Sequence, residues 1–260
     1  MCLKKKALEV EEFLTEVVTK QHFVCITEHW YMQKEVDCIR LQEYIPTSVC
    51  ARENRTHGGS AIFVCESVEA EELINIRKLS IKGQIEVSAV VNRPLKTVVI
   101  CIYRPPSSEE ILFLSVLADI LNSLLNNFIQ FTHILAGDFN IDLLETSNLD
   151  TISYKNIVQM SGFNIANNID NKHATKFTYN GRPSLLDHVL YNKRLNCSVK
   201  VLDDAIGDHR QLSIDVRQNI NIFREKINKT IDIIDYNVFY NKFEQGIANK
   251  QIESMEQDTE

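Results

Sequence analysis

The chain has 260 residues, and its 28 Lys and Arg against 35 Asp and Glu give a formal net charge of −7 at pH 7. Hydrophobic residues make up 44% and charged residues 24%, as in ordinary soluble globular proteins, so disorder, collagen and coiled coil are excluded as descriptions of the whole chain. This length suits one large domain or two small ones and can bury a core without disulfides or a structural metal.

One helix and several strands can be predicted in the first half of the chain. Apolar residues spaced three and four apart predict a helix over residues 3–20. Runs rich in β-branched and aromatic residues then predict strands at 22–27, 60–65, 84–91 and 97–103. The prolines Pro105 and Pro106 end the last of these strands, because proline cannot donate a hydrogen bond to a neighbouring strand.

Helices and strands are interleaved in the second half. Residues 107–110 have the pattern of a helix start, and the strongly apolar segment 111–128 is expected to be a core helix. A further helix is expected at 151–161. Short strands are expected at 134–136, 177–179, 185–191, 199–202 and 212–216. Strands that follow one another without a helix favour an α/β protein with mixed sheets over a purely parallel one.

Two features bear on domain organisation and compartment. Residues 221–260 are polar, with 5 basic against 8 acidic residues, and are expected to form a linker or tail after a domain at 1–220. None of the seven cysteines forms a C-x-x-C pair, which argues against a zinc knuckle, and those inside apolar runs are expected to be reduced residues of an intracellular protein. There is no apolar run of 18 residues, so no membrane partner is expected.

Four carboxylates recur at the ends of the expected strands or within them. They are Glu28, Asp138, Asp187 and Asp208. A carboxylate in such a place is costly to desolvate unless it is paired or binds a metal. A single one is most simply a turn or cap residue, but four of them, together with a tyrosine, an asparagine and two histidines, are not explained in that way.

The types of residue in this set indicate a class of chemistry. Hard oxygen ligands suit Mg²⁺ or Mn²⁺, and magnesium in proteins commonly binds one or two carboxylates plus a substrate phosphate. A histidine paired with an aspartate is oriented as a base or a stabiliser of charge. The chain has no G-x-x-x-x-G-K-[ST] loop and no plausible Ser or Cys nucleophile with a matching base. The residue types therefore favour metal-assisted hydrolysis of a phosphate ester.

Six short segments, taken together and in this order, point to a family. They are ITEHW (26–30), GGSAI (58–62), YRPP (103–106), AGDFN (136–140), SLLDHV (184–189) and GDH (207–209). In these segments the chain resembles the endonuclease/exonuclease/phosphatase superfamily, and most of all the endonuclease domain of a jockey-like non-LTR retrotransposon of the kind found in insects. The resemblance implies a four-layer αββα sandwich of two packed mixed β-sheets flanked by helices, with the site at one end of the sheets.

The resemblance also implies roles for the metal and the attacking water. Glu28 would be the ligand of Mg²⁺, with Mn²⁺ as a substitute, and Asp208 would be a second acidic contact near the metal. Asp138 would orient or deprotonate the attacking water. Asn140 would bind the phosphate and hold that group in place.

Further residues would act on the phosphate. Tyr103 would hydrogen-bond the scissile phosphate, and His209 would stabilise the negative charge that grows on its oxygens. Asp187 would pair with His209 or in the neighbourhood of His188 and help to fix the imidazole. The residues expected to bind the substrate are Arg104, Asn140 and Lys176. A local basic rim is expected to give weak, salt-sensitive DNA binding in spite of the acidic net charge. It consists of Arg104, Lys176, Arg182 and Arg210.

One departure from the family pattern concerns the start of the chain. Members begin with a strand that carries an Asn of the metal site, ahead of the first helix. Here the helix at 3–20 stands close to the start, so this strand is expected to be missing. The segment 221–260 would lead to a reverse transcriptase, which is the expected partner domain in the parent polyprotein.

Three functions follow from these observations. The first is a Mg²⁺-dependent nuclear endonuclease that nicks duplex DNA and leaves a 3′-hydroxyl to prime a reverse transcriptase. The second is a catalytically impaired fragment derived from a retrotransposon. The third is another branch of the superfamily that acts on inositol phosphates or sphingomyelin, which the YRPP segment and the spacing around Asn140 make less favoured.

Overall fold

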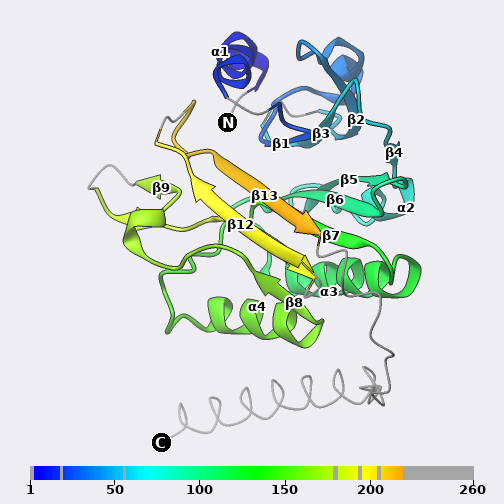
Figure 1. The fold of residues 1–260 in the computed structure, drawn as a ribbon. Coiled ribbons are helices and arrows are strands. Elements are labelled where there is room, and N and C mark those ends of the chain that lie inside the picture. The colour runs from blue at the N-terminus through cyan, green and yellow to red at the C-terminus, as the bar shows by residue number, and fades with distance from the viewer. Residues whose placement is uncertain are drawn as a thin grey trace, which may run out of the picture. The chain divides into compact units, whose positions relative to one another are not determined.

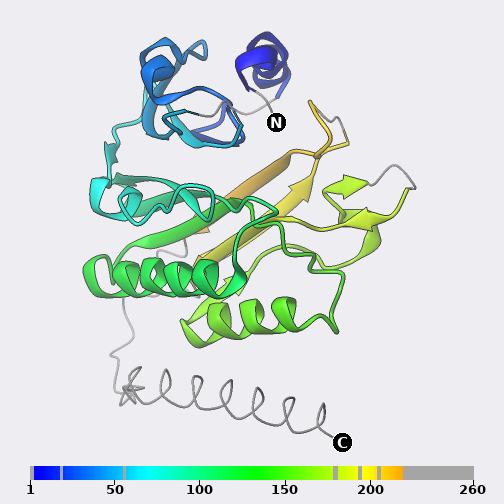
Figure 2. The same ribbon diagram turned by 180° about the vertical axis from the view of Figure 1, so that it is seen from behind.

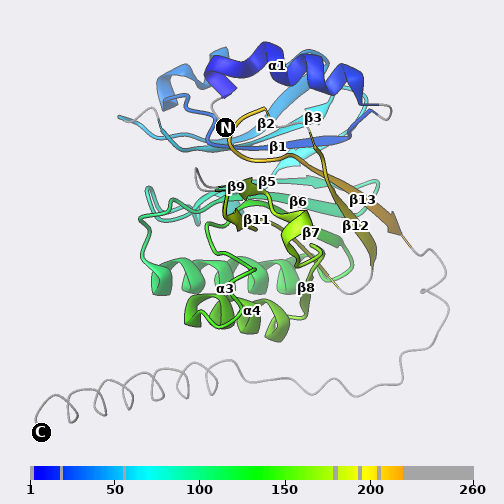
Figure 3. The same cartoon turned by 90° about the vertical axis from the view of Figure 1, so that its left-hand side faces the viewer.

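Four layers of secondary structure stack in the order helix, sheet, sheet and helices (Figure 3). The computed structural model describes residues 3–17, 20–54, 57–177, 181–192, 195–203 and 206–218. All of them belong to the unit Met1–Asn219, and the expected linker at 221–260 lies outside the described residues.

The elements have the following bounds (Figure 1). The described helices are α1 (Leu3–Glu16), α2 (Ile74–Arg77), α3 (Glu110–Asn127) and α4 (Leu149–Met160), with short 3-10 helices at Gln33–Cys38 and Asn171–His173. A three-stranded sheet has the order β1 (Phe23–Thr27), β3 (Ser60–Cys65), β2 (Tyr44–Cys50). A six-stranded sheet has the order β4 (Glu71–Glu72), β5 (Glu86–Asn92), β6 (Thr97–Tyr103), β7 (Thr132–Asp138), β11 (Asp187–Asn192), β8 (Phe163–Ile165). Two hairpins pair β9 (Lys176–Phe177) with β10 (Pro183–Ser184) and β12 (Leu195–Val201) with β13 (Leu212–Gln218).

The helical layer under the six-stranded sheet consists of α3 and α4, which lie side by side (Figure 2). The apolar residues of α3 recur every three or four positions, so one face of this helix is buried against the sheet. None of the described helices combines the length and the apolar composition needed to cross a membrane.

Strand β6 explains why the centre of the sequence reads as one continuous apolar run. Val98, Ile100 and Ile102 face the helices, whereas Val99 and Cys101 face the three-stranded sheet. Because successive side chains of a strand point to opposite faces, a strand buried on both sides must be apolar throughout. The six-stranded sheet is mixed, since β6 and β7 are parallel and the other pairs are antiparallel. The expected mixed α/β fold is confirmed.

A cavity of about 230 Å³ lies between β1 and β13. Among the described strands β1 pairs only with β3, and β13 pairs only with β12. Apolar side chains of α1 and residues of β7 also line this cavity. It reaches the polar residues at the ends of β1, β7 and β13, so it leads directly to the candidate site.

Several elements differ from the sequence-based expectations. Strand β2 was not expected, and it is irregular because its pairing with β3 shifts register between Pro46 and Ser48. The short strand β8 was also not expected. The first helix ends at Glu16, before the predicted end at residue 20, and its backbone is interrupted at Lys6. The long helix predicted at 111–128 agrees with α3.

Candidate active site

Three adjacent strands bring polar residues to one row at the edge of the six-stranded sheet. Tyr103 is the last residue of β6 and lies opposite Asp138, the last residue of the parallel strand β7. Asp187 begins the antiparallel strand β11 and lies opposite Asp138 on the other side. The three side chains are neighbours because the last residues of β6 and β7 and the first residue of the antiparallel β11 lie side by side in the sheet. The sequence spacing alone does not reveal this row, which depends on the order of the strands.

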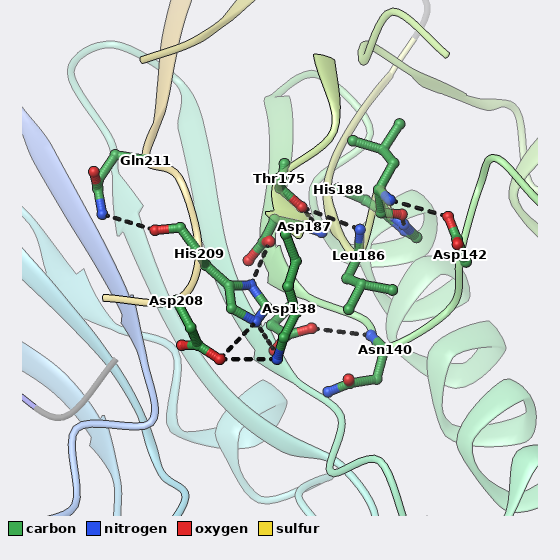
Figure 4. Close-up of polar contacts among 12 residues, drawn as sticks. Asp138, Asn140, Asp142, Thr175, Leu186, Asp187, His188, Asp208, His209 and Gln211 are labelled. Carbon is green, nitrogen blue, oxygen red and sulfur yellow. Dashed lines mark hydrogen bonds and ion pairs between the residues drawn. The ribbon is translucent and has the colours of Figure 1, made fainter. Parts of the chain in front are cut away.

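His209 joins the row from the loop before β13 (Figure 4). Its Nδ1 lies 2.7 Å from Asp187 Oδ2, and its Nε2 lies 4.0 Å from Asp138 Oδ2. One potential ligand atom from each of Asp138, Asp187 and His209 lies within 4.8 Å of the other two. The arrangement is a network of two carboxylates and one imidazole, suited to hold and move a proton.

Electrostatics of this network keep a proton available near neutral pH. Burial and the neighbouring Asp187 carboxylate raise the pKa of Asp138 to about 7. Burial disfavours the charged imidazole of His209, but the hydrogen bond and charge of Asp187 outweigh it and raise the pKa of that histidine. Asp138 is therefore near its own midpoint at pH 7, where a general base is most effective.

Glu28 follows β1 and contacts Tyr103 across the layers. The Tyr103 hydroxyl donates to Glu28 Oε1, and burial together with this carboxylate raises the pKa of the phenol well above its usual value. Tyr103 is therefore held as a neutral donor. Glu28, Asp138, Asp187 and His209 all line one end of the cavity between β1 and β13.

Asn140 is fixed by the turn that follows β7. Its backbone N–H donates to Asp138 Oδ1 at 3.0 Å, and its side-chain amide donates to the Arg104 carbonyl at 2.6 Å. The residue has a φ of +47°, which is uncommon for a side chain other than glycine. Gly137 makes the approach of β7 possible, because a Cβ there would overlap the Ile102 carbonyl of β6.

Asp208 and Lys176 lie at the exposed side of the site. Lys176 Nζ is 2.9 Å from Asp208 Oδ2, and Asp208 Oδ2 is 4.0 Å from His209 Nε2. The Asp208 side chain is 67% exposed. Burial would raise the pKa of Asp208, but the ion pair with Lys176 holds that pKa below its usual range.

The basic residues expected at the rim are engaged in contacts within the chain. The Arg104 side chain is buried, where Nε donates to Ser108 Oγ at 2.7 Å and the guanidinium lies over the Phe113 ring. Arg210 lies over the Phe177 ring, and Arg182 pairs with Glu145. The structure thus places Arg104 away from the cavity end, and its expected role in substrate binding stays a prediction.

Two histidines near the motifs have structural surroundings. His188 is fully buried between the Tyr154 hydroxyl and the carbonyls of Ile141 and Leu185, and burial lowers its pKa to about 4. His29 is buried beside the Cys50 carbonyl, and burial lowers its pKa to about 4 as well. Both are therefore neutral at pH 7, and neither lies in the network of His209.

Sequence reasoning missed residues that support this site from outside the motifs. Thr175 Oγ1 accepts hydrogen bonds from the backbone of Leu186 and Asp187, and its carbonyl accepts from Arg210 N at 2.7 Å. This threonine therefore joins the start of β11 to the loop that carries His209. Glu86, at the start of β5, falls within the strand predicted at 84–91, where the sequence marks it as no more than a strand residue. No local pattern marks either residue, because their partners are distant in sequence.

The donor set at the end of the cavity fits a divalent cation. Glu28, Asp138 and Asp187 present carboxylate oxygens there, which are the ligands preferred by Mg²⁺ and Mn²⁺. Of these, Glu28 would hold the metal, with Asp208 near it, while Asp138 and Asp187 are committed to the network with His209.

Comparison with known proteins bears on the fold and on the family. The family described as endonuclease-reverse transcriptase matches residues 97–213, and no curated protein matches the sequence. The solved endonuclease domain of TRAS1, a telomere-specific non-LTR retrotransposon, superposes with a TM-score of 0.61 at 16% identity, over 84% of this chain and 94% of that one. The AP endonuclease LMAP from Leishmania major gives a TM-score of 0.61 at 13% identity, over 84% of each chain.

A third solved structure is a 3′ phosphatase from Neisseria bound to a product DNA hairpin. It has a TM-score of 0.59 and 15% identity, and it covers 83% of this chain and 95% of that one. At such identities these likenesses bear on the fold. The chain therefore has the fold of the endonuclease/exonuclease/phosphatase superfamily, and its resemblance to the endonucleases of non-LTR retrotransposons, first indicated by the six segments, is confirmed.

Proposed function

We propose that this chain is a divalent-metal-dependent endonuclease that nicks duplex DNA in the nucleus. It would leave a 3′-hydroxyl, which a reverse transcriptase of the same polyprotein would extend. The observation that carries the proposal is the network of Asp138, Asp187 and His209, which lies with Glu28 at the end of one cavity. The match of residues 97–213 to an endonuclease-reverse transcriptase family supports DNA as the substrate.

The residues divide the hydrolysis between them. Asp138, with a pKa of about 7, accepts a proton from the attacking water, whose oxygen forms a bond to phosphorus. The bond from phosphorus to the 3′ oxygen breaks, and that oxygen takes up a proton. His209, oriented by Asp187, faces the phosphoryl oxygens and stabilises their charge. Asn140 supplies a neutral hydrogen-bond donor to the same phosphate, and Tyr103 would donate its one hydroxyl proton there in place of Glu28 once the substrate is bound.

A divalent cation held by Glu28, with Asp208 nearby, would stabilise negative charge on the phosphate and on the leaving oxygen. Tyr103 fixes the Glu28 carboxylate by its hydrogen bond. Because the hydroxyl carries one proton, it would orient Glu28 before the substrate binds and donate to the phosphate afterwards. The ion pair of Lys176 with Asp208 places a positive charge at the exposed side of the site, where the DNA backbone would approach.

A second candidate is a chain with this fold but impaired catalysis. The cavity between β1 and β13 supports it, because neither strand pairs with a further described strand on that side. Strands left unpaired on this side would hold Glu28 and the loop before β13 less firmly than a continuous sheet would.

Nicking of supercoiled plasmid in Mg²⁺ tests the proposal and separates the two candidates. We expect relaxed plasmid whose nick is extended by a DNA polymerase without prior treatment, since extension requires a 3′-hydroxyl. Intact plasmid would favour the impaired fragment. Nicks that a polymerase extends only after a 3′ phosphatase treatment would contradict the proposed bond cleavage. Hydrolysis of inositol phosphates in place of DNA would favour the other branch of the superfamily.

A further inference from the structure

Glu86 is a buried carboxylate that the proposed chemistry does not use. It begins β5, in which every residue is buried, and only 1% of its side chain is exposed. It lies opposite Tyr103 in the pairing of β5 with β6. A carboxylate in such a place is costly to desolvate unless charged or polar partners surround it. Its position beside the candidate site raises the question of what these partners are.

Two partners of Glu86 lie in the loop between β2 and β3, and a third, the Gly83 N–H, lies 3.4 Å from Oε1 just before β5. Arg52 Nε donates to Glu86 Oε1, and the backbone N–H of Gly59 donates to Glu86 Oε2. Each carboxylate oxygen thus holds a different point of this loop. Hydrogen bonds to a charged group are roughly twice as strong as neutral ones, and leaving one buried partner unpaired is costly. Glu86 therefore fixes the Gly59 peptide relative to β5.

The Gly59 peptide in turn holds Glu28. Its carbonyl accepts a hydrogen bond from the backbone N–H of Glu28 at 2.7 Å, and the carbonyl of Gly58 accepts from Trp30 N at 3.1 Å. Glu28 and Trp30 have φ values of +57° and +65°, in the left-handed region that side chains other than glycine rarely adopt. Such a conformation persists only where the surroundings enforce it.

Packing against His29 makes the contact rigid. Gly59 has a φ of +93°, and a Cβ there would overlap the His29 ring. The ring is itself fixed, because Tyr31 N donates to Nδ1 and Nε2 lies 3.0 Å from the Cys50 carbonyl. A displacement of Gly59 would therefore be transmitted to the segment that carries Glu28.

We propose that Glu86 is a positioning residue that acts through Gly59 on Glu28. It keeps the loop in place, and the loop keeps the Glu28 carboxylate against Tyr103 and towards Asp138. The proposal rests on the proposed function in one respect, namely that Glu28 holds the divalent cation. Glu86 itself touches neither the cation nor the substrate.

The fluorescence of Trp30 reports directly on the segment that carries Glu28, because Trp30 is the only tryptophan of the chain and follows Glu28 by two residues. Its ring packs 4.2 Å from the His57 ring, centroid to centroid, so its emission reports on both segments of the contact. Mn²⁺ bound by Glu28 is expected to change Trp30 fluorescence. The concentration of Mn²⁺ at the midpoint then measures the affinity of the site without any assay of activity.

The experiment compares the Mn²⁺ midpoint of the wild type with that of Glu86→Gln. The amide keeps the shape of the side chain but can accept through one oxygen only, so it loses its contact with either Arg52 or Gly59. We expect the midpoint to rise about 10- to 100-fold, the usual effect of removing a residue that orients a metal ligand. Glu72→Gln is the matched control, because Glu72 pairs with Arg77 and accepts from Ser48 without contacting the loop at Gly59.

The outcomes separate this proposal from the proposed function. A raised midpoint in Glu86→Gln, with an unchanged one in Glu72→Gln, supports the positioning role. An unchanged midpoint in a folded Glu86→Gln overturns it. If that variant does not fold, Glu86→Asp decides, because the shorter carboxylate keeps the charge but is drawn back from Arg52 and the Gly59 N–H; a raised midpoint supports the role and an unchanged one overturns it. Absence of any Mn²⁺ response in the wild type would overturn the assignment of Glu28 as a metal ligand, and with it both proposals.

Discussion

The imidazole of His209 and the carboxylate of Asp187 lie 2.7 Å apart, from Nδ1 to Oδ2. This contact joins the loop before β13 to the first residue of β11, which is a strand of the six-stranded sheet. It fixes the orientation of the ring so that Nε2 faces Asp138 at 4.0 Å. The position of the functional imidazole thus depends on a pair formed across 22 residues of sequence.

Replacing Asp187 by Asn tests this pair. The amide removes the negative charge that raises the pKa of His209, so both the charge and the orientation of the ring are lost. We expect the nicking rate to fall by about 10²- to 10⁴-fold, and the pKa of His209, followed by NMR, to fall as well.

The exposed pair of Asp170 and His173 offers a matched control for this change. Its Nδ1 to Oδ1 distance is also 2.7 Å, but it lies outside the cavity that holds His209. Asp170→Asn should leave nicking unchanged. Equal loss in both variants would mean that the Asp187 contact has no specific role in the reaction.

The pH dependence of nicking should reflect the raised pKa of Asp138. The residue accepts a proton only when ionised, and burial and Asp187 raise its pKa to about 7. The value of kcat/KM should therefore fall about tenfold per pH unit on acidification below about pH 7. A steady-state profile between pH 5 and 8 measures this. A rate that stays constant down to the ordinary range of an aspartate would contradict the role of Asp138.

Tyr103→Phe should distinguish the role of the Tyr103 hydroxyl in orienting Glu28 from the role of its ring in packing. The ring remains, but the hydroxyl that donates to Glu28 is removed. We expect nicking to fall by about 10²- to 10³-fold, as for the loss of one donor to a developing charge, with little change in the urea midpoint of unfolding.

Tyr154→Phe provides the contrast for this variant. The Tyr154 hydroxyl is fully buried against His188 and away from the cavity, so its removal should lower stability and leave the rate per folded molecule unchanged. A larger loss of rate from Tyr154→Phe than from Tyr103→Phe would show that the assigned roles are wrong.

His188 should make the protein sensitive to mild acid. Its pKa is lowered from 6.5 to about 4 in the folded chain, so the unfolded chain binds more protons between these values. The contribution of His188 to the free energy of unfolding is therefore complete above pH 6.5. It falls by roughly 3 kcal/mol as the pH falls towards 4. Urea unfolding at several pH values measures the loss. In His188→Gln the free energy of unfolding should depend less on pH. An unchanged dependence would mean that other groups cause the loss of stability in acid.

Much of the fold could be predicted from local sequence patterns. The apolar periodicity of α3 is strong because one face of the helix is buried, and the apolar run of β6 is continuous because every residue of the strand is buried. Strand β2 has no such pattern, since Pro46 interrupts it and its pairing with β3 is irregular. Strand β8 has only three residues, too few for a period to be seen.

Some residues of the candidate site could likewise be predicted from the sequence, and others could not. Glu28, Asp138 and His209 stand in short motifs that can be read from the sequence, and the structure places them at one cavity, although their roles stay predictions. Glu86 and Thr175 carry no such motif. Their importance arises from partners tens of residues away, which only the pairing of strands brings into contact. Likewise the burial of Arg104 against Phe113 depends on the packing of α3.

The most direct test of the whole account is the rate of plasmid nicking by the wild type and Asp138→Asn in Mg²⁺. Asp170→Asn and an excess of EDTA serve as controls. The account predicts nicking by the wild type and by Asp170→Asn, abolished by EDTA, and a rate for Asp138→Asn that is lower by about 10²- to 10⁴-fold. Nicking that survives EDTA, or that proceeds equally in Asp138→Asn, would contradict metal-assisted hydrolysis at this site.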